Sequence, residues 1–192
     1  TVDLAVLGRR ERDHRSGFEV APMPHIDAAP NERETRYGGL DDQRLGGITW
    51  DEIGAIRSWS SMPLVLKGIL APDDARRAVD VGVAGIVVST HGGRQLDRSI
   101  ASADALGPIV DAVAGQTEVW VDGGIRRGLD VVTALCLGAT GVLVGRPMYW
   151  ALAAGGQAGV ERAIAMLRHE LELALPLLGA ASVGALSREL LT

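Results

Sequence analysis

The alternation of short apolar segments with helical stretches is the feature that most constrains the fold of this chain. From residue 62 onward, apolar segments at 64–66, 85–89, 118–121 and 141–144 are separated by candidate helices at 71–81, 102–114 and 127–137. The segments are apolar almost throughout, which is typical of strands buried on both faces of a parallel sheet. Asp73 and Asp74, after Pro72, suit the positive end of the first helix. The pattern predicts an α/β fold built from βαβ units.

Such units can form two kinds of sheet, an open doubly wound sheet or a closed TIM (β/α)8 barrel. Polar and glycine-rich residues follow each strand, where both architectures place their sites. Repeated GATGVLVG-like strand starts and the absence of a GxGxxG turn favour the barrel. With a further strand at 1–6, the chain supplies about five of the eight strands that closure requires. We expect the others to lie upstream in a longer chain or to come from another polypeptide.

The remaining segments are a long irregular region and two flanking helices. Residues 11–48 carry many charges and three prolines, Pro22, Pro24 and Pro30, and are predicted to form a lid or mobile insertion. A helix is expected at 49–59, where Thr49 and Glu52 form a capping box. Another is expected at 160–178, with an apolar stripe that must pack on something. The stripe consists of Ile164, Leu167, Leu171, Leu175 and Leu178.

Composition excludes several classes of protein. The 192 residues carry a formal net charge of −5, which argues against a nucleic-acid-binding module. The only cysteine, Cys136, excludes an internal disulfide and a cysteine-based metal cluster, and no metal is expected. No stretch approaches the roughly 18 apolar residues of a membrane span, and the N-terminus lacks a signal pattern. We therefore expect a cytoplasmic protein, and the start at Thr1 without Met indicates a fragment or a processed chain.

The densest cluster of polar residues is STHGGRQLD, residues 89–97, directly after an apolar strand. His91 accepts a proton near neutral pH, and the guanidinium of Arg94 can bind a carboxylate through two parallel hydrogen bonds. Together they suit an organic acid from which a proton is removed. The alternative interpretation is a capping histidine and a surface arginine; we favour the first in this context.

Two further clusters indicate an anion site. DGGIRRG at 122–128 and Gly145-Arg146-Pro147 each place glycine amides at an expected helix start and add arginine, which favours a phosphate. They follow the last two strands, the usual phosphate position in a barrel. Lys67 ends an apolar strand and needs an anionic partner there. Asp3, within the strand at 1–6, would orient His91 if it lay opposite the ring.

These motifs resemble the FMN-dependent α-hydroxy-acid oxidases and dehydrogenases, which include glycolate oxidase, lactate oxidase and mandelate dehydrogenase. The blocks LGRRERD, LVLKGI, STHGGRQLD, VDGGIRRGLDV and LGATGVLVGRP occur in the order and spacing of that family. The resemblance implies that residues 1–192 form the C-terminal part, about strands 4 to 8, of a TIM barrel. It also implies FMN as cofactor, a homotetramer, and an N-terminal half that completes the site.

The resemblance assigns roles to individual residues. His91 resembles the catalytic base, Asp3 the carboxylate that supports it, and Arg10 and Arg94 the arginines that hold the substrate carboxylate. Thr90 stands where the family usually has Asn. The cofactor-binding positions that match are Thr1, Lys67, Ser89, Asp122, Gly123, Gly124, Arg126, Gly145 and Arg146. Lys67 matches the lysine that stabilises reduced, anionic flavin.

The implied reaction is oxidation of an L-2-hydroxy acid of the glycolate, lactate or mandelate class to the 2-oxo acid. His91 takes a proton while two electrons pass to flavin, as hydride or through a carbanion, and then to oxygen or another acceptor. Two alternatives are a non-catalytic barrel half that binds FMN or nothing, and another flavin barrel such as a dihydroorotate dehydrogenase. The set His91, Arg94, Arg10 and Lys67 favours the hydroxy-acid enzyme.

Overall fold

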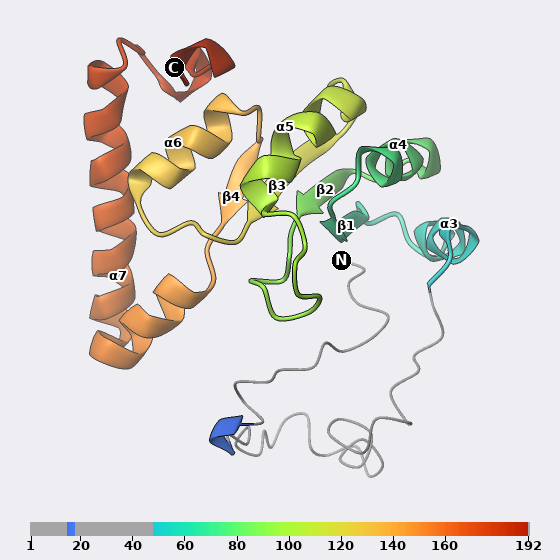
Figure 1. The fold of residues 1–192 in the computed structure, drawn as a ribbon, viewed down its shortest axis with the longest axis horizontal. Helices are drawn as coiled ribbons and strands as arrows, with labels where there is room; N and C mark the ends of the chain where they lie inside the picture. Colours follow the sequence, from blue (N-terminus) through green and yellow to red (C-terminus); the bar gives the residue numbers. More distant parts are fainter. Residues whose placement is uncertain (1–14, 18–47, 192) are drawn as a thin grey trace.

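The computed structural model describes residues 15–17 and 48–191, and Figure 1 shows how their helices and strands are arranged. The elements are α3 (Trp50–Ser58), β1 (Val65–Ile69), α4 (Pro72–Val81), β2 (Gly85–Val88), α5 (Ser102–Val113), β3 (Glu118–Asp122), α6 (Gly128–Cys136), β4 (Gly141–Leu143) and α7 (Arg146–Leu177), followed by the 3₁₀ helices η1 (Val183–Ala185) and η2 (Arg188–Leu190). The strand expected at 1–6 and nearly all of the predicted lid at 11–48 lie outside the described residues.

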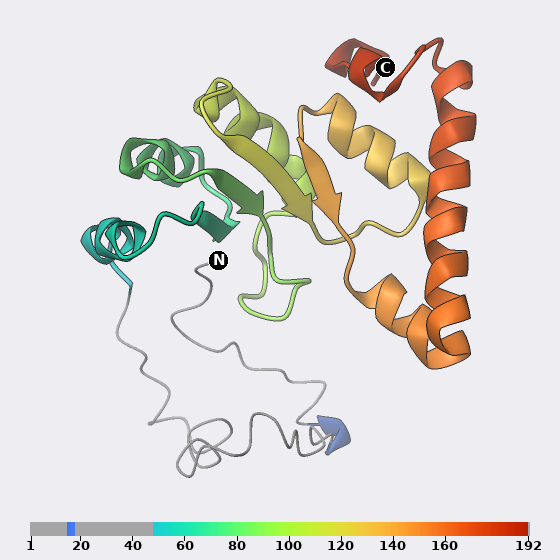
Figure 2. The same ribbon diagram turned by 180° about the vertical axis from the view of Figure 1, so that it is seen from behind.

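The four described strands form one parallel sheet in the order β1-β2-β3-β4. Helices α4, α5 and α6 connect successive strands and follow one another along the sheet in both ribbon views (Figures 1 and 2). The βαβ units and the parallel α/β fold expected from the sequence are therefore confirmed. Because all four strands run the same way, their carboxyl ends lie at one edge of the sheet.

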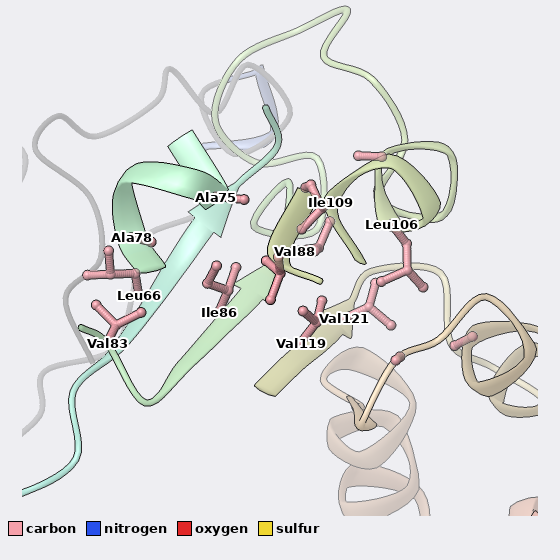
Figure 3. Packing of buried hydrophobic residues seen from close by; sticks show 14 of the residues in the cluster. Leu66, Ala75, Ala78, Val83, Ile86, Val88, Leu106, Ile109, Val119 and Val121 are labelled. Carbon is pink, nitrogen blue, oxygen red and sulfur yellow. The ribbon is translucent and has the colours of Figure 1, made fainter. Parts of the chain in front are cut away.

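The core lies between the strands and the connecting helices (Figure 3). Its strand residues are Leu66, Ile86, Val88, Val119 and Val121, and its helix residues include Ala75, Ala78, Leu106 and Ile109. Successive strand residues point to opposite faces. Lys67 and its register neighbour Val87 therefore point to the other face of the sheet, as does Trp120, which pairs with Val87. The placement of a lysine on that face is a consequence of the core pattern.

The start signals predicted for α3 and α4 are confirmed. Pro72 begins α4, with Asp73 and Asp74 in its first turn. At α3, the amide of Glu52 donates to Thr49 Oγ1 at 3.3 Å, and the amide of Thr49 donates to Glu52 Oε2 at 2.7 Å. The hydrogen bond from the Thr49 backbone lowers the pKa of the Glu52 carboxyl. These contacts satisfy N–H groups that a helix leaves without intrahelical partners.

Helix α7 is longer than the helix expected at 160–178. It begins at Arg146, and the glycine pair Gly155 and Gly156 interrupts it with non-helical backbone, so that it consists of two helical parts. The expected apolar stripe packs only near its C-terminal end, where Leu171 and Leu178 join a small cluster with residues of α6. Ile164 is 54% exposed, so no packing partner for that part of the stripe lies among the described residues. No helix in the described ranges is long and apolar enough to cross a membrane.

Arg188 in η2 ties the C-terminal segment to the layer of connecting helices. Its guanidinium Nη1 lies 2.8 Å from Asp111 Oδ1, and Nη2 donates to the carbonyls of Gly107 (3.1 Å) and Leu137 (3.3 Å). One side chain thus contacts α5 and the end of α6. The neighbouring Leu186 and Leu190 pack on the cluster that contains Cys136, whose thiol has its pKa raised by burial.

We expect Arg188→Ala to lower the melting temperature of the protein more than Arg168→Ala does. Arg168 also forms a 2.8 Å ion pair, with Glu172, but that pair lies within one exposed helix and joins no separate elements. Thermal unfolding of the two variants measures the difference. Equal melting temperatures would show that the contacts of Arg188 with α5 and α6 contribute nothing to stability.

The stabilisation by Arg188 should also depend on pH. The hydrogen bond from Arg188 lowers the pKa of Asp111 below its ordinary value of 3.8. A carboxyl with a lowered folded-state pKa stabilises the fold above its unfolded-state pKa, and this contribution is lost as pH falls through the lowered value. The difference in melting temperature between the wild type and Asp111→Asn should therefore be constant near neutral pH and shrink below about pH 4. A constant difference throughout would contradict this account.

Candidate functional site

The candidate residues that lie among the described ones collect at the carboxyl edge of the sheet. Lys67 lies in β1, Ser89 and His91 follow β2, and Asp122 is the last residue of β3. Gly145 and Arg146 follow β4 and begin α7. The parallel strand order brings four connections to one edge, where α/β proteins place their ligands.

The loop after β2 holds His91 in a tight turn. Three consecutive residues, His91, Gly92 and Gly93, have positive φ values of 54°, 71° and 70°. The amide of His91 donates to Ser89 Oγ at 3.0 Å, and the amide of Gly93 donates to the carbonyl of Thr90, also at 3.0 Å. A left-handed backbone at a residue other than glycine is uncommon and often marks a functional position. Ser89, which is 1% exposed, thus positions the histidine.

The ring of His91 lies against the end of β1. Its Nδ1 is 3.1 Å from Lys67 Nζ, and a Cβ added to Gly68 would lie 2.7 Å from its Nε2. Gly68 has φ 103° and coincides with a shift of register between β1 and β2. The missing side chain therefore gives the imidazole room at a β-bulge, a feature that commonly redirects side chains near active sites.

Lys67 connects His91 with Asp122. Its Nζ lies 3.7 Å from Asp122 Oδ2, and the two side chains are 20% and 18% exposed. The anionic partner expected for this lysine is therefore present, and the imidazole is a second neighbour. A protonated amine has only donors, so Nδ1 accepts in this arrangement. This contact ties the imidazole to β1, next to the carboxylate of Asp122.

Two buried oxygens at this edge have no hydrogen-bond partner among the residues described. They are Asp122 Oδ1 and the hydroxyl oxygen of Ser102, at the start of α5. A Cβ at Gly123 would lie 3.3 Å from that hydroxyl, so the backbone at Gly123 lies close to the side chain of Ser102. Buried acceptors without partners are rare, and a carboxylate oxygen in this state suits a ligand hydroxyl.

The anion site expected at the start of α6 needs a correction. The amides of Arg126 and Arg127 donate to Asp130 Oδ2 at 2.8 and 2.9 Å. The amide of Gly128 donates to Glu170 Oε2 of α7 at 2.6 Å. Carboxylates of the chain therefore already occupy the positive end of α6, and the expectation of free amides there is wrong. Gly123 and Gly124 lie before this helix, with φ of 87° and 84°.

The start of α7 has a different character. Gly145 is its N-cap residue, no side chain of the described residues caps it, and Arg146 opens its first turn. A Cβ at Gly145 or at Gly124 would meet nothing within 4 Å among the described atoms. Both backbones are thus accessible to a ligand. Arg146 Nη2 donates to the carbonyl of Gly92 at 2.9 Å.

The other candidates have different outcomes. Thr1, Asp3 and Arg10 lie outside the described residues. Arg94 is exposed on the loop of His91, and Arg126 is exposed after β3. Gly68 and Gly92 stand in the glycine-rich motifs at the end of β1 and after β2, but the sequence did not indicate that Gly68 makes room for the imidazole, and Ser102 was not identified as part of this edge. The signal for Gly68 was a glycine within an apolar strand next to a lysine, a pattern that indicates a bulge or a close approach.

A hollow of about 500 Å³ lies at the opposite end of the strands and is lined by residues near the starts of β2 and β3, including Thr117 and Glu118. Glu118 is the only titratable side chain of its lining. In barrels the amino-terminal edge serves stability and the carboxyl edge serves chemistry. The candidate site is therefore the edge with His91.

A comparison with protein families matches residues 1–192 to FMN-dependent dehydrogenases. The chain is 50% identical to an L-lactate oxidase of Nostoc sp. over 93% of its own length and 52% of that protein. It is 49% identical to a 4-hydroxymandelate oxidase of Amycolatopsis orientalis over 98% of its length and 55% of that protein.

The chain belongs to the FMN-dependent dehydrogenase family. Membership confirms the family resemblance and the expectation of FMN as cofactor. A crystal structure of a mandelate oxidase with 3,3-difluoro-2-hydroxy-3-phenylpropionic acid is similar to this member of the family, with a TM-score of 0.81 and 47% identity. The match covers 97% of this chain and 52% of that one. The chain spans about half the length of the curated relatives that it matches.

Gly68→Ala should displace the imidazole of His91, because the new Cβ would lie 2.7 Å from Nε2. Nitrogen chemical shifts of the imidazole, measured by NMR, should differ from those of the wild type. Gly115→Ala is the control, since it adds a Cβ at a similar left-handed φ of 74° with no atom within 4 Å. Unchanged shifts in Gly68→Ala would show that the ring does not depend on this space.

Proposed function

We propose that the protein of which this chain is a part oxidises an L-2-hydroxy acid to the 2-oxo acid with FMN. The observation that carries the proposal is the convergence of Lys67, His91 and Asp122 at the carboxyl edge of the sheet, with 3.1 and 3.7 Å between their polar atoms. Relatives named L-lactate oxidase and 4-hydroxymandelate oxidase support the substrate class. The glycolate, lactate and mandelate classes are the substrates to test.

The residues at this edge fit the parts of FMN. Asp122 Oδ1, buried without a partner in the described part of the chain, suits a ribityl hydroxyl. The open backbones at Gly124 and Gly145, together with the guanidinium groups of Arg126 and Arg146, suit the phosphate. Gly123, Ser89 and Thr1 are further proposed contacts. Lys67 is proposed to lie beside the flavin, where its ammonium stabilises added negative charge.

The chain's own groups bind the substrate and move its proton. Arg94 and Arg10 are proposed to hold the substrate carboxylate, each through two parallel hydrogen bonds. That contact directs the hydroxyl-bearing carbon toward His91. An imidazole nitrogen of His91 takes the proton that leaves the substrate, and Asp3 stabilises the resulting imidazolium. Bound FMN supplies a two-electron acceptor for the pair of electrons that the hydroxy acid loses.

The two possible routes differ in which proton His91 receives. If the α-hydrogen leaves with both electrons as hydride, His91 takes the hydroxyl proton. If a carbanion forms, His91 takes the proton of the α-carbon first, and the hydroxyl proton is released when the two electrons leave the substrate. In both cases the substrate loses two electrons and becomes the 2-oxo acid. Oxygen or another acceptor then removes the electrons from the cofactor.

The proposed architecture is a TIM barrel, of which this chain forms the C-terminal part, about strands 4 to 8. Within the described residues, β1 and β4 are the outer strands of the sheet, and a barrel would pair both. We propose that an N-terminal half supplies the remaining strands and that residues 11–48 cover the site. The homotetramer and the cytoplasmic location expected from the sequence stay predictions.

His91→Gln should retain FMN and slow its reduction by a 2-hydroxy acid about 10²- to 10⁴-fold, because glutamine cannot accept a proton. Anaerobic stopped-flow absorbance of the full-length polypeptide measures this rate. Loss of flavin colour in the wild type with lactate, glycolate or mandelate is the positive reference. Colour that persists with every acid would instead support the non-catalytic alternative, and near-normal reduction in the variant would remove His91 from the role of base.

Arg94→Lys should mainly raise the substrate concentration needed for half-maximal reduction. An ammonium cannot form the planar bidentate pair that a guanidinium makes with a carboxylate. The limiting rate at saturating substrate should change less than the apparent dissociation constant, by the same stopped-flow assay. If only the limiting rate falls, Arg94 does not act through binding of the carboxylate.

A further inference from the structure

The contact between Arg146 and Gly92 joins two parts of the site that lie on different connections. Arg146 opens α7 after β4, whereas Gly92 follows His91 in the loop after β2. Their hydrogen bond spans 54 residues of sequence. No strand pairing links these connections directly, because β3 lies between β2 and β4.

We propose that Arg146 is a positioning residue that couples occupancy of the phosphate site to the conformation of the loop carrying His91. The inference rests on the proposed function, in which the start of α7 receives the phosphate of FMN. It adds that the same guanidinium holds the carbonyl next to the proposed base. A phosphate bound at α7 would thereby fix the histidine for the reaction.

The geometry of a guanidinium permits both contacts at once. It has five N–H groups in a fixed plane, and one of them, on Nη2, serves Gly92. The others can pair with a phosphate at the start of α7. An anion there would restrain an exposed side chain that otherwise carries much rotamer freedom. The restrained side chain would then hold the Gly92 carbonyl more firmly.

The loop itself needs such a restraint. Its three consecutive left-handed residues include His91, for which this conformation is unfavourable. The turn is held by the amides of His91 and Gly93, which donate to Ser89 Oγ and to the Thr90 carbonyl. The bond from Arg146 to Gly92 lies between these two and acts on the same turn. Loss of that bond should therefore increase exchange of both amides with solvent.

Two adjacent glycines provide a matched pair of variants. Gly92 and Gly93 have φ of 71° and 70°, so alanine adds similar backbone strain at either position. A Cβ at Gly92 would lie 3.1 Å from Arg146 Nη2, whereas a Cβ at Gly93 would meet nothing within 4 Å. Gly92→Ala should shift the guanidinium by a few tenths of an ångström and weaken its hydrogen bond to the Gly92 carbonyl, and Gly93→Ala should leave it in place.

The experiment measures hydrogen–deuterium exchange of peptides covering residues 89–97 in the full-length polypeptide freed of FMN. Inorganic phosphate, riboflavin and FMN are added separately. Phosphate and FMN should slow exchange in the wild type about fivefold to tenfold, and riboflavin should slow it less, because it lacks the phosphate. Gly93→Ala should retain this phosphate-dependent difference. Arg146→Lys should lose it, and Gly92→Ala should reduce it, even at saturating FMN.

A double-mutant cycle gives a second readout from flavin reduction at saturating FMN. Adding Arg146→Lys should slow reduction less in the Gly92→Ala background than in the Gly93→Ala background, where it should act independently. Equal exchange with FMN and riboflavin, or equal behaviour of the two glycine variants, would overturn the coupling. If no 2-hydroxy acid reduces FMN in the wild type, the proposed function is overturned instead. Hydrogen–deuterium exchange with added inorganic phosphate would still test the coupling between Arg146 and the His91 loop.

Discussion

The parallel register of the four described strands is the constraint on which the rest of the site depends. It places Leu66, Ile86 and Val119 toward the helices, and it leaves Lys67 and Trp120 on the other face. A slip of one residue in β1 would bury the lysine among apolar side chains and remove it from His91. Core packing and the placement of the charged groups thus follow from one pairing.

Electrostatics then decides what this edge can bind. Lys67 lies between an imidazole nitrogen, His91 Nδ1, and a carboxylate oxygen, Asp122 Oδ2. Its charge is only partly screened, since the lysine is 20% exposed. The start of α6 is occupied by Asp130 and Glu170, whereas the start of α7 has no side-chain cap among the described residues. An anionic cofactor is therefore better matched at α7 than at α6.

Local patterns in the sequence predicted most of the described elements. The four strands and the helices α3 to α6 lie within a few residues of the expected ranges, because their apolar segments alternate regularly and Thr49 and Pro72 mark the starts of two of the helices. The first part of α7 was missed. Gly155 and Gly156 break its periodicity, and the segment before them has exposed apolar residues such as Tyr149 and Trp150.

Contacts between distant residues could not be predicted in this way. Glu170 occupies the amide of Gly128 from 42 residues away, and nothing in the motif DGGIRRG indicates it. The approach of His91 to Lys67 depends on the bulge at Gly68, which is a property of the pairing between two strands. The types of residue in the site could be predicted from the motifs, whereas the direction in which each side chain points depends on packing.

Three glycines at this edge make room for polar side chains of the candidate site. Gly68 makes room for an imidazole, Gly92 for a guanidinium, and Gly123 for the hydroxyl of Ser102. Each adopts a positive φ that other residues adopt at a cost. Each also increases the conformational entropy that folding must overcome. Polar contacts between the loops that follow different strands, such as the hydrogen bond from Arg146 to the Gly92 carbonyl, compensate for this entropy cost. They do so where the glycines leave the backbone most free.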